Sequence, residues 1–225
     1  MLGQISLLLA VPKMSSQKRL VQLDVDSTFI QQEAIELLAA KAGVLDEVSR
    51  ITAAAMRGEL DFAQSLIARV ALLQGLGEDA IIQVQKEILL TDGAAELVSL
   101  LHEKGHYISL VSGGFTDILQ PIVDELKIDF YKANTLEIID GELTGKVVGP
   151  IVDRAAKAEA LKEFAQKCSV ELVNTVAIGD GANDLDMMQV AGISIAFNAK
   201  PIVEAATDYS IKEPSLRSVP ALINL

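Results

Sequence analysis

The hydrophobic pattern of the chain changes character along its length. Leu20–Val25 is an apolar run that ends abruptly in polar residues, which is typical of a buried strand in a parallel sheet. From about Gln31 to Leu90 the apolar residues recur at helical spacing, and three segments rich in Ala, Leu and Glu end at Gly43, Gly58 and Gly75. The pattern therefore predicts one strand followed by an all-helical stretch.

Strands and helices alternate in the rest of the chain. The helical patterns cover residues 93–105, 115–127 and 154–168. The apolar runs that predict strands cover residues 106–114, 173–181 and 192–197. Asp140 and Gly141 give a turn signal, which indicates a hairpin. Together these elements predict an α/β fold with a doubly wound, Rossmann-like parallel-sheet core.

The same boundaries divide the chain into parts. We expect an N-terminal extension over residues 1–18, a core formed by residues 19–30 and 91–225, and a helical cap over residues 31–90. The cap is inserted after the first strand, beside the sheet edge where ligands bind in such folds. The apolar segment Ile5–Val11 lacks the basic residues and the cleavage site of a signal peptide, so we expect a terminal strand or a tail.

Composition limits the classes of partner. The 225 residues carry a formal net charge of −12, which argues against nucleic acid or an anionic membrane as partner. No apolar run approaches the roughly 18 residues of a membrane span. The single cysteine, Cys168, excludes an internal disulfide and suits a reducing cytoplasm, and with only His102 and His106 available no zinc site is expected. We therefore expect a cytoplasmic protein with a small-molecule substrate.

Carboxylates follow two of the expected strands. Asp24 and Asp26 come at the end of the first buried strand, although like charges repel and burial disfavours both. Asp180 and Asp184 follow a later strand in the segment "GDGANDLDMM". Oxygen ligands of this kind suit a hard divalent cation, Mg²⁺ above others. A bound cation would explain why a buried strand ends in aspartates.

Groups suited to phosphate occur at corresponding positions. Ser112 lies in "VSGGF", where its hydroxyl and the Gly113 and Gly114 amides can form an anion seat between a strand and a helix. Lys157 lies in the helix before the strand that leads to Asp180, where its ammonium can reach an anion. These groups and the carboxylates predict a site where a metal and a phosphoryl group meet.

Each motif alone also has an ordinary structural explanation. "DVDST" can form a turn and a helix cap, "SGGF" a flexible turn, and Lys157 a solvated charge on a helix. The acidic segment can equally form a calcium-type loop. Because the motifs occur together and in order on an α/β frame, their combination favours the catalytic interpretation.

The four segments resemble the motifs of haloacid dehalogenase superfamily phosphatases, in the same order. Such enzymes use the first aspartate of the opening motif as a nucleophile and the second as general acid and base. The resemblance implies that Asp24 is the nucleophile and Asp26 the acid and base. It also implies that Mg²⁺ is held by Asp24, the Asp26 carbonyl and Asp180, with Asp184 in support.

A longer resemblance covers nearly the whole chain from about Arg19. The segments "QQEAIELLAAKAGV", "MRGELDFAQSLIARVALLQGL" and "FNAKPIVEAATDY" are similar to the branch of the superfamily that hydrolyses O-phosphoserine. This resemblance implies that Glu33 binds the ammonium and Arg69 the carboxylate of the amino acid. It further implies four phosphate-binding residues: Ser112, Gly113, Lys157 and Asn183.

The expected function is Mg²⁺-dependent hydrolysis of O-phospho-L-serine to L-serine and phosphate, through an aspartyl-phosphate intermediate. One alternative is a phosphatase of the same superfamily for another small phosphomonoester, because specificity resides in the cap. A more distant alternative is a non-enzymatic phosphate-binding or receiver-like module. Asp26 and the large cap argue against that second alternative.

Overall fold

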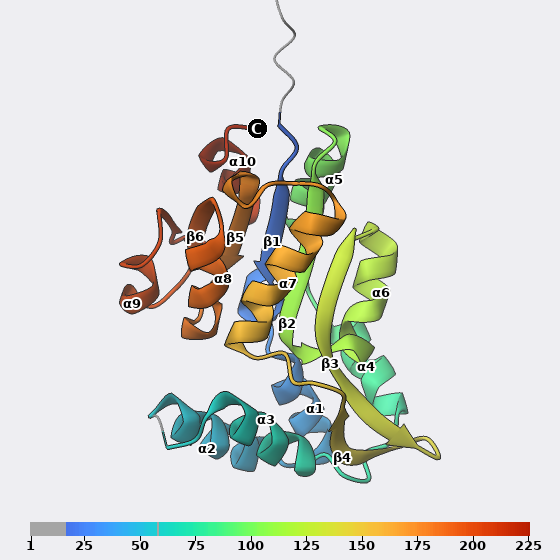
Figure 1. The fold of residues 1–225 in the computed structure, drawn as a ribbon. Helices are drawn as coiled ribbons and strands as arrows, with labels where there is room; N and C mark the ends of the chain where they lie inside the picture. The colour runs from blue at the N-terminus through green and yellow to red at the C-terminus, as the bar shows by residue number, and fades with distance from the viewer. Residues whose placement is uncertain (1–16, 58) are drawn as a thin grey trace, which may run out of the picture.

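The computed structural model describes residues 17–57 and 59–225, so the segment Ile5–Val11 lies outside the described residues. Within them, one sheet has the strand order β4-β3-β2-β1-β5-β6-β7 (Figure 1). Its strands are β1 (Leu20–Asp24), β2 (Tyr107–Phe115), β3 (Phe130–Ile139), β4 (Glu142–Val148), β5 (Thr175–Gly179), β6 (Ile193–Phe197) and β7 (Tyr209–Ile211). Neighbouring strands are parallel except for the antiparallel pair β3–β4. The predicted parallel-sheet core and its hairpin are confirmed.

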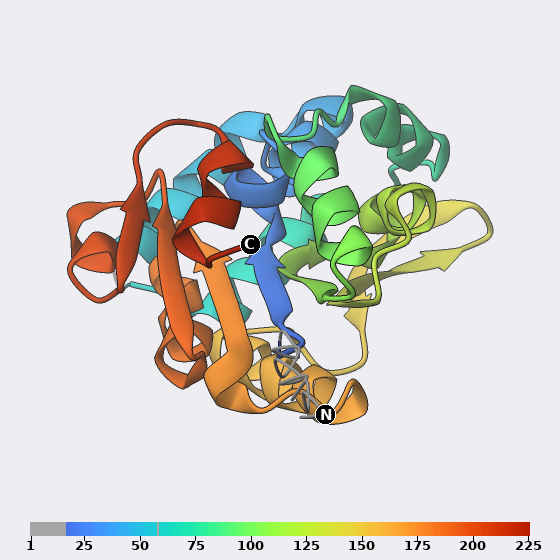
Figure 2. The same cartoon turned by 90° about the horizontal axis from the view of Figure 1, so that it is seen from above.

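Helices cover both faces of this sheet (Figures 1 and 2). They are α1 (Ala34–Ala42), α2 (Leu45–Met56), α3 (Phe62–Ala71), α4 (Asp79–Glu87), α5 (Ala94–Glu103), α6 (Thr116–Leu126), α7 (Arg154–Lys167), α8 (Leu185–Val190), α9 (Pro201–Glu204) and α10 (Val219–Leu222). Apolar residues of α5, α6 and α10 fill one hydrophobic cluster, and those of α7 and α8 fill another. Every residue of β1 is buried, as expected for a central strand covered on both faces. None of the helices described is long and apolar enough to cross a membrane.

Helices α1–α4, called the cap helices below, lie within residues 31–90. Figure 1 shows α1–α3 beyond the carboxyl end of the central strands. The chain enters and leaves this region through paired segments, in which the Gln31 N–H donates to the Leu89 carbonyl at 2.9 Å and the Thr91 N–H to the Phe29 carbonyl at 3.0 Å. These bonds place the two connections side by side.

The cap helices also contact the β3–β4 hairpin. The Gly75 N–H donates to the Leu143 carbonyl at 2.8 Å, and the Leu143 N–H donates to the Leu76 carbonyl at 2.9 Å. Their hydrophobic cluster includes Phe115 at the end of β2 and Leu136 on β3. Because this cluster extends into the expected core, the division of the chain into cap and core stays a prediction.

Candidate active site

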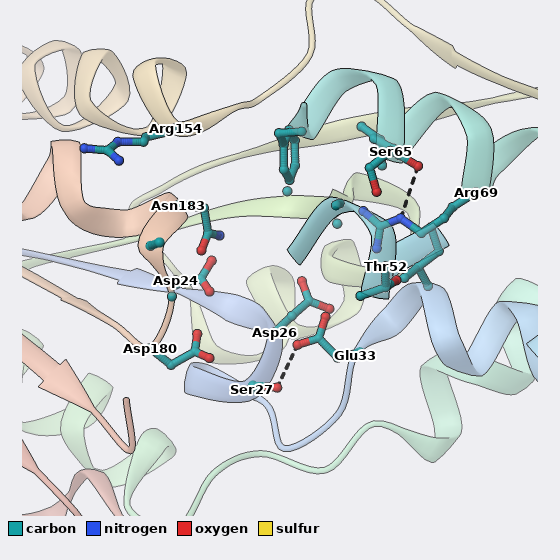
Figure 3. Close-up of a pocket in the computed structure, with 18 of the residues that line it drawn as sticks. Asp24, Asp26, Ser27, Glu33, Thr52, Ser65, Arg69, Arg154, Asp180 and Asn183 are labelled. Carbon is teal, nitrogen blue, oxygen red and sulfur yellow. Dashed lines mark hydrogen bonds between the residues drawn. The ribbon is translucent and has the colours of Figure 1, made fainter. Parts of the chain in front are cut away.

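The carboxyl ends of the central strands bring the predicted residues to one edge of the sheet. Asp24 is the last residue of β1 and pairs in register with Val111 of β2, while Asp180 directly follows β5. Ser27 adopts a left-handed backbone conformation, with φ of 58°, in the turn Val25–Phe29 that leads from β1 toward the cap helices. A cavity of about 780 Å³ lies between this edge and the cap helices (Figure 3).

A buried lysine joins the aspartates of the first and last motifs. Lys157, on α7, is 1% exposed, and its Nζ donates to Asp24 Oδ1 at 2.5 Å and to Asp184 Oδ1 at 2.7 Å. Burial disfavours the ammonium, but the charges of Asp184 and Asp24 outweigh burial and hold the pKa of Lys157 above its usual value. Lys157 is therefore a fixed positive charge behind the cavity wall.

Three carboxylates converge at this point. Asp24, Asp180 and Asp184 each offer an oxygen, and these oxygens lie within 4.8 Å of one another. Burial and then the Asp184 charge raise the pKa of Asp24 well above its ordinary value, and the same two causes raise the pKa of Asp180 to about 6. One ammonium does not compensate three carboxylates. The donor set thus fits a metal ion, and its all-oxygen chemistry suits a hard divalent cation.

Asp26 is held from two sides. Its Oδ1 accepts from the Ala34 N–H of α1 at 2.7 Å, and its Oδ2 accepts from Ser112 Oγ at 2.8 Å. Ser112 Oγ in turn accepts from the Gly114 N–H at 2.7 Å. Of the groups expected in an anion seat, the Gly114 amide is therefore bonded to the Ser112 hydroxyl, and the hydroxyl is bonded to Asp26. The difference arises because β2 continues through Phe115, so these groups belong to a strand and not to a helix N-terminus.

Glu33 and Arg69 lie on the cap side of the cavity (Figure 3). Glu33 precedes α1 and accepts from Ser27 Oγ at 2.7 Å, and Arg69 Nε, on α3, donates to the Ser65 carbonyl at 3.2 Å. Burial and then the Asp26 charge raise the pKa of Glu33 to about 7, against the lowering effect of Ser27. Glu33 also faces solvent, which screens part of this effect. Burial lowers the pKa of Arg69, and the Glu33 charge opposes this.

The structure brings all the predicted site residues to the cavity or to groups that border it. Figure 3 shows Asn183 and Asp24 on the side of the pocket away from Arg69. The predicted residues that line the cavity are Asp24, Asp26, Glu33, Arg69, Gly113, Asp180 and Asn183. Three others are buried and contact those residues or one another: Ser112, Lys157 and Asp184.

Sequence reasoning missed two buried amide side chains beside the site. Gln22, on β1, is fully buried, and its Nε2 donates to the Lys157 carbonyl at 3.0 Å. Asn134, on β3, is 2% exposed, and its Nδ2 donates to the Gly113 carbonyl at 2.8 Å. The only available signal was an amide residue within each strand segment. That signal does not distinguish a buried amide from a solvated one.

The parallel-sheet fold and the converging carboxylates at its edge match those of one class of hydrolase. The family model of haloacid dehalogenase-like hydrolases matches residues 21–189. Because this match spans most of the chain, the chain belongs to the haloacid dehalogenase-like hydrolase family. The predicted superfamily is thereby confirmed.

Individual relatives are more specific. A phosphoserine phosphatase of Streptomyces coelicolor is 54% identical over 208 residues, which cover 92% of this chain and 51% of the relative. A phosphoserine phosphatase of Lactococcus lactis is 50% identical over 202 residues, which cover 90% of this chain and 94% of the relative. The chain thus spans about half the length of the Streptomyces relative and nearly all of the Lactococcus relative.

Solved structures extend the similarity to the cap helices. A substrate-bound phosphoserine phosphatase complex superposes with a TM-score of 0.87 at 40% identity, covering 92% of this chain and 98% of that one. A phospho-aspartyl intermediate analogue of phosphoserine phosphatase gives a TM-score of 0.86 at 41% identity, covering 92% and 99%. The likeness therefore includes both the sheet and the helices over its edge.

Proposed function

We propose that this chain hydrolyses O-phospho-L-serine to L-serine and phosphate, with Mg²⁺ as cofactor and a covalent phosphate on Asp24 as intermediate. The observation that carries the proposal is one cavity bordered by Asp24 and Asp26 from the sheet edge and by Glu33 and Arg69 from the cap side. Similarity to a substrate-bound phosphoserine phosphatase and to a phospho-aspartyl analogue supports it. The proposal includes the division into core and cap, and a cytoplasmic location.

We assign the metal site to Asp24, the Asp26 carbonyl and Asp180, with Asp184 in support. Asp184 suits a supporting role, because its Oδ1 accepts from Lys157 and its Oδ2 accepts from the Gly181 N–H at 3.1 Å. When bound, Mg²⁺ supplies positive charge to the phosphate oxygens and to the carboxylates. Without added positive charge, a dianionic ester would meet a cavity lined by acidic groups.

Asp24 acts as the nucleophile in this proposal. Its carboxylate oxygen bonds to phosphorus in line with the bond to the serine oxygen, which breaks. The Lys157 ammonium, 2.5 Å from Asp24 Oδ1, holds the carboxylate in one orientation and offsets part of its charge. Water then attacks the phosphorus of the aspartyl-phosphate, which releases inorganic phosphate and restores Asp24.

Asp26 moves the protons in both steps. It protonates the departing serine oxygen, and afterwards it removes a proton from the attacking water. An alkoxide is a poor leaving group, so protonation matters more for serine than for an acidic phenol. The bonds from Ala34 and Ser112 hold the Asp26 carboxylate at the cavity for these transfers.

Binding of the substrate is divided between the sheet edge and the cap side. Gly113 and Asn183 line the cavity and are proposed to contact the phosphate directly. Ser112 and Lys157, which are buried, complete the proposed phosphate-binding set through Asp26 and Asp24, to which they donate. Glu33 offers its carboxylate to the substrate ammonium, and Arg69 offers its guanidinium to the substrate carboxylate. A zwitterionic amino acid matches this pair of opposite charges.

The experiment is a panel of phosphate-release assays with phosphoserine, phosphothreonine, phosphotyrosine, sugar phosphates and p-nitrophenyl phosphate. We expect the highest kcat/KM for phosphoserine, loss of activity on chelation, and recovery with Mg²⁺. A higher kcat/KM for a sugar phosphate would replace the proposal with a phosphatase for another small phosphomonoester. Absence of turnover, together with a long-lived aspartyl-phosphate, would favour the receiver-like module.

A further inference from the structure

A chain of hydrogen bonds behind the cavity wall starts at Asn134, which has no role in the mechanism above. Asn134 does not line the cavity, and the residue is 2% exposed. Its Nδ2 donates to the Gly113 carbonyl at 2.8 Å, and its Oδ1 accepts from the Val152 N–H at 2.8 Å. One buried amide thus ties β3 to the end of β2 and to the segment that leads into α7.

The hydrogen bond from Asn134 fixes the orientation of the Gly113–Gly114 peptide group, which lies close to Asp26. In a trans peptide the C=O and the N–H point in opposite directions. Because the Gly113 carbonyl points to Asn134, the Gly114 N–H points the other way, where it donates to Ser112 Oγ at 2.7 Å. Ser112 Oγ then donates to Asp26 Oδ2 at 2.8 Å. The bonds run in sequence from Asn134 to Asp26.

The direction of the Ser112 hydroxyl depends on this peptide. A hydroxyl has one proton to donate, and the Gly114 N–H occupies an acceptor position on Ser112 Oγ. The hydroxyl proton is therefore directed to Asp26. If the peptide rotated, the Gly113 carbonyl would face Ser112 and accept that proton, and Asp26 would lose its donor.

Glycine makes such a rotation easier. A Cβ at Gly114 would lie 2.7 Å from Asp26 Oδ2 and 2.9 Å from Ser112 Oγ, so the close packing leaves no room for a side chain. Two consecutive glycines, Gly113 and Gly114, leave the peptide between them with more conformational freedom than any other pair of residues. The Asn134 side chain on the neighbouring strand β3 restricts that freedom, because it donates to the Gly113 carbonyl.

We propose that Asn134 is a positioning residue for Asp26, acting through the Gly113–Gly114 peptide and the Ser112 hydroxyl. The assignment rests on the proposed function, because it concerns the step in which Asp26 transfers a proton to the serine oxygen. Asn134 itself touches neither substrate nor reacting atoms. Its loss therefore affects proton transfer and leaves the nucleophile Asp24 in place.

The test compares two substrates in the Asn134→Asp variant. This change removes the donor to Gly113 but keeps the shape of the side chain and an acceptor for the Val152 N–H. We expect kcat/KM for phosphoserine to fall about 10- to 100-fold, and kcat/KM for p-nitrophenyl phosphate to change less than about threefold, because nitrophenolate departs without a proton. The Asn134→Ala variant removes both bonds, and we expect it to give the same preferential loss.

Two controls separate positioning from a general structural effect. Ser194, on β6, is also buried, donates to Asp208 Oδ2 at 2.8 Å and accepts from the Asp208 N–H at 3.0 Å. Ser194→Ala therefore removes buried hydrogen bonds away from the site, and we expect it to leave the ratio of the two kcat/KM values unchanged. In a Ser112→Ala background the Asn134→Asp change should no longer alter this ratio, because the path runs through Ser112.

The outcomes distinguish this assignment from the proposed function. A wild-type protein that does not hydrolyse phosphoserine would refute the proposed function. An active wild type with an equal fall for both substrates, or with an unchanged ratio in both Asn134 variants, would refute only the positioning role. An effect of Asn134→Asp that persists in the Ser112→Ala background would also overturn it.

Discussion

Replacing Arg69 by alanine tests the identity of the substrate. Arg69 reaches the cavity from α3, and Figure 3 shows its guanidinium directed toward the side where Glu33 and Asp26 lie. Its Nε donates to the Ser65 carbonyl at 3.2 Å, which fixes the side chain within its own helix. The planar group is thus positioned in advance to bind a carboxylate through two parallel hydrogen bonds.

The expected magnitude follows from the loss of one charge-assisted interaction. Such a hydrogen bond contributes about 1.5 to 3 kcal/mol, and about 1.4 kcal/mol corresponds to a factor of ten in rate. We therefore expect Arg69→Ala to lower kcat/KM for phosphoserine about 10- to 150-fold. Glu33→Ala should have an effect of similar size, because it removes the proposed partner of the substrate ammonium.

Substrates that lack one of these charges provide the assay. Phosphoethanolamine keeps the ammonium but has no carboxylate, so Arg69→Ala should change its kcat/KM less than about threefold, whereas Glu33→Ala should lower it. p-Nitrophenyl phosphate has neither group and should be nearly insensitive to both changes. Arg50→Ala is the matched control, because Arg50 lies on cap helix α2, has a 75% exposed side chain and pairs with Glu47.

Two results would contradict a role of Arg69 and Glu33 in substrate recognition. Equal losses for phosphoserine and p-nitrophenyl phosphate would mean that Arg69 and Glu33 maintain the cap helices and do not recognise the amino acid. Full activity of both variants with phosphoserine would mean that the natural substrate has a different leaving group. Either result leaves the metal and nucleophile assignments intact, because both substrates use them.

Three further predictions concern the carboxylates. Asp24→Asn should lower turnover about 10⁴-fold or more. It should not lower the free energy of unfolding in urea, because burial and the Asp184 charge already disfavour the ionised Asp24. A clear loss of stability would contradict this prediction. Burial and the Asp184 charge raise the pKa of Asp180 from 3.8 to about 6. In metal-free protein, protonated Asp180 should therefore contribute stability that is complete below pH 3.8 and is lost as the pH rises through about 6. Asp180→Asn should weaken this pH dependence of the free energy of unfolding, measured in urea titrations. Chelation should abolish phosphate release, and Mg²⁺ should restore it. Ca²⁺ should restore little, because its higher coordination number favours binding of both Asp24 oxygens. Full activity in Ca²⁺ alone would contradict this prediction.

Hydrophobic periodicity was sufficient to predict the main elements of the fold. The apolar run that begins at Leu20 predicted β1, and the helical patterns after it predicted the helices over the sheet edge. The later change between strand and helix patterns predicted the alternating elements of the core. The elements that escaped prediction are short: β7 has three residues, α9 and α10 have four each, and α8 has six. A period of 3.6 or 2 is not measurable over so few positions, and tertiary packing decides whether they form.

The site was predictable in its residue types and less so in its contacts. Lys157 was expected near an anion, and the structure pairs it with Asp24 and Asp184, because both aspartates and α7 meet behind the same sheet edge. The bond from Ser112 to Asp26 was not predicted. It depends on which way one peptide between two glycines points, and local sequence does not determine that orientation.

The carboxylates of the cavity are only partly paired with positive charge. Lys157 binds one oxygen each of Asp24 and Asp184, while Asp180 accepts only from Thr28 Oγ1, at 3.4 Å, among the side-chain donors in the part of the chain described. The raised pKa values of Asp24 and Asp180 show that this cluster gains from any added positive charge, whether a proton or a cation. We therefore expect protons to compete with the proposed Mg²⁺ for these oxygens. Affinity for Mg²⁺ should weaken as the pH falls through about 6, because the carboxylate of Asp180, a proposed metal ligand, is then protonated.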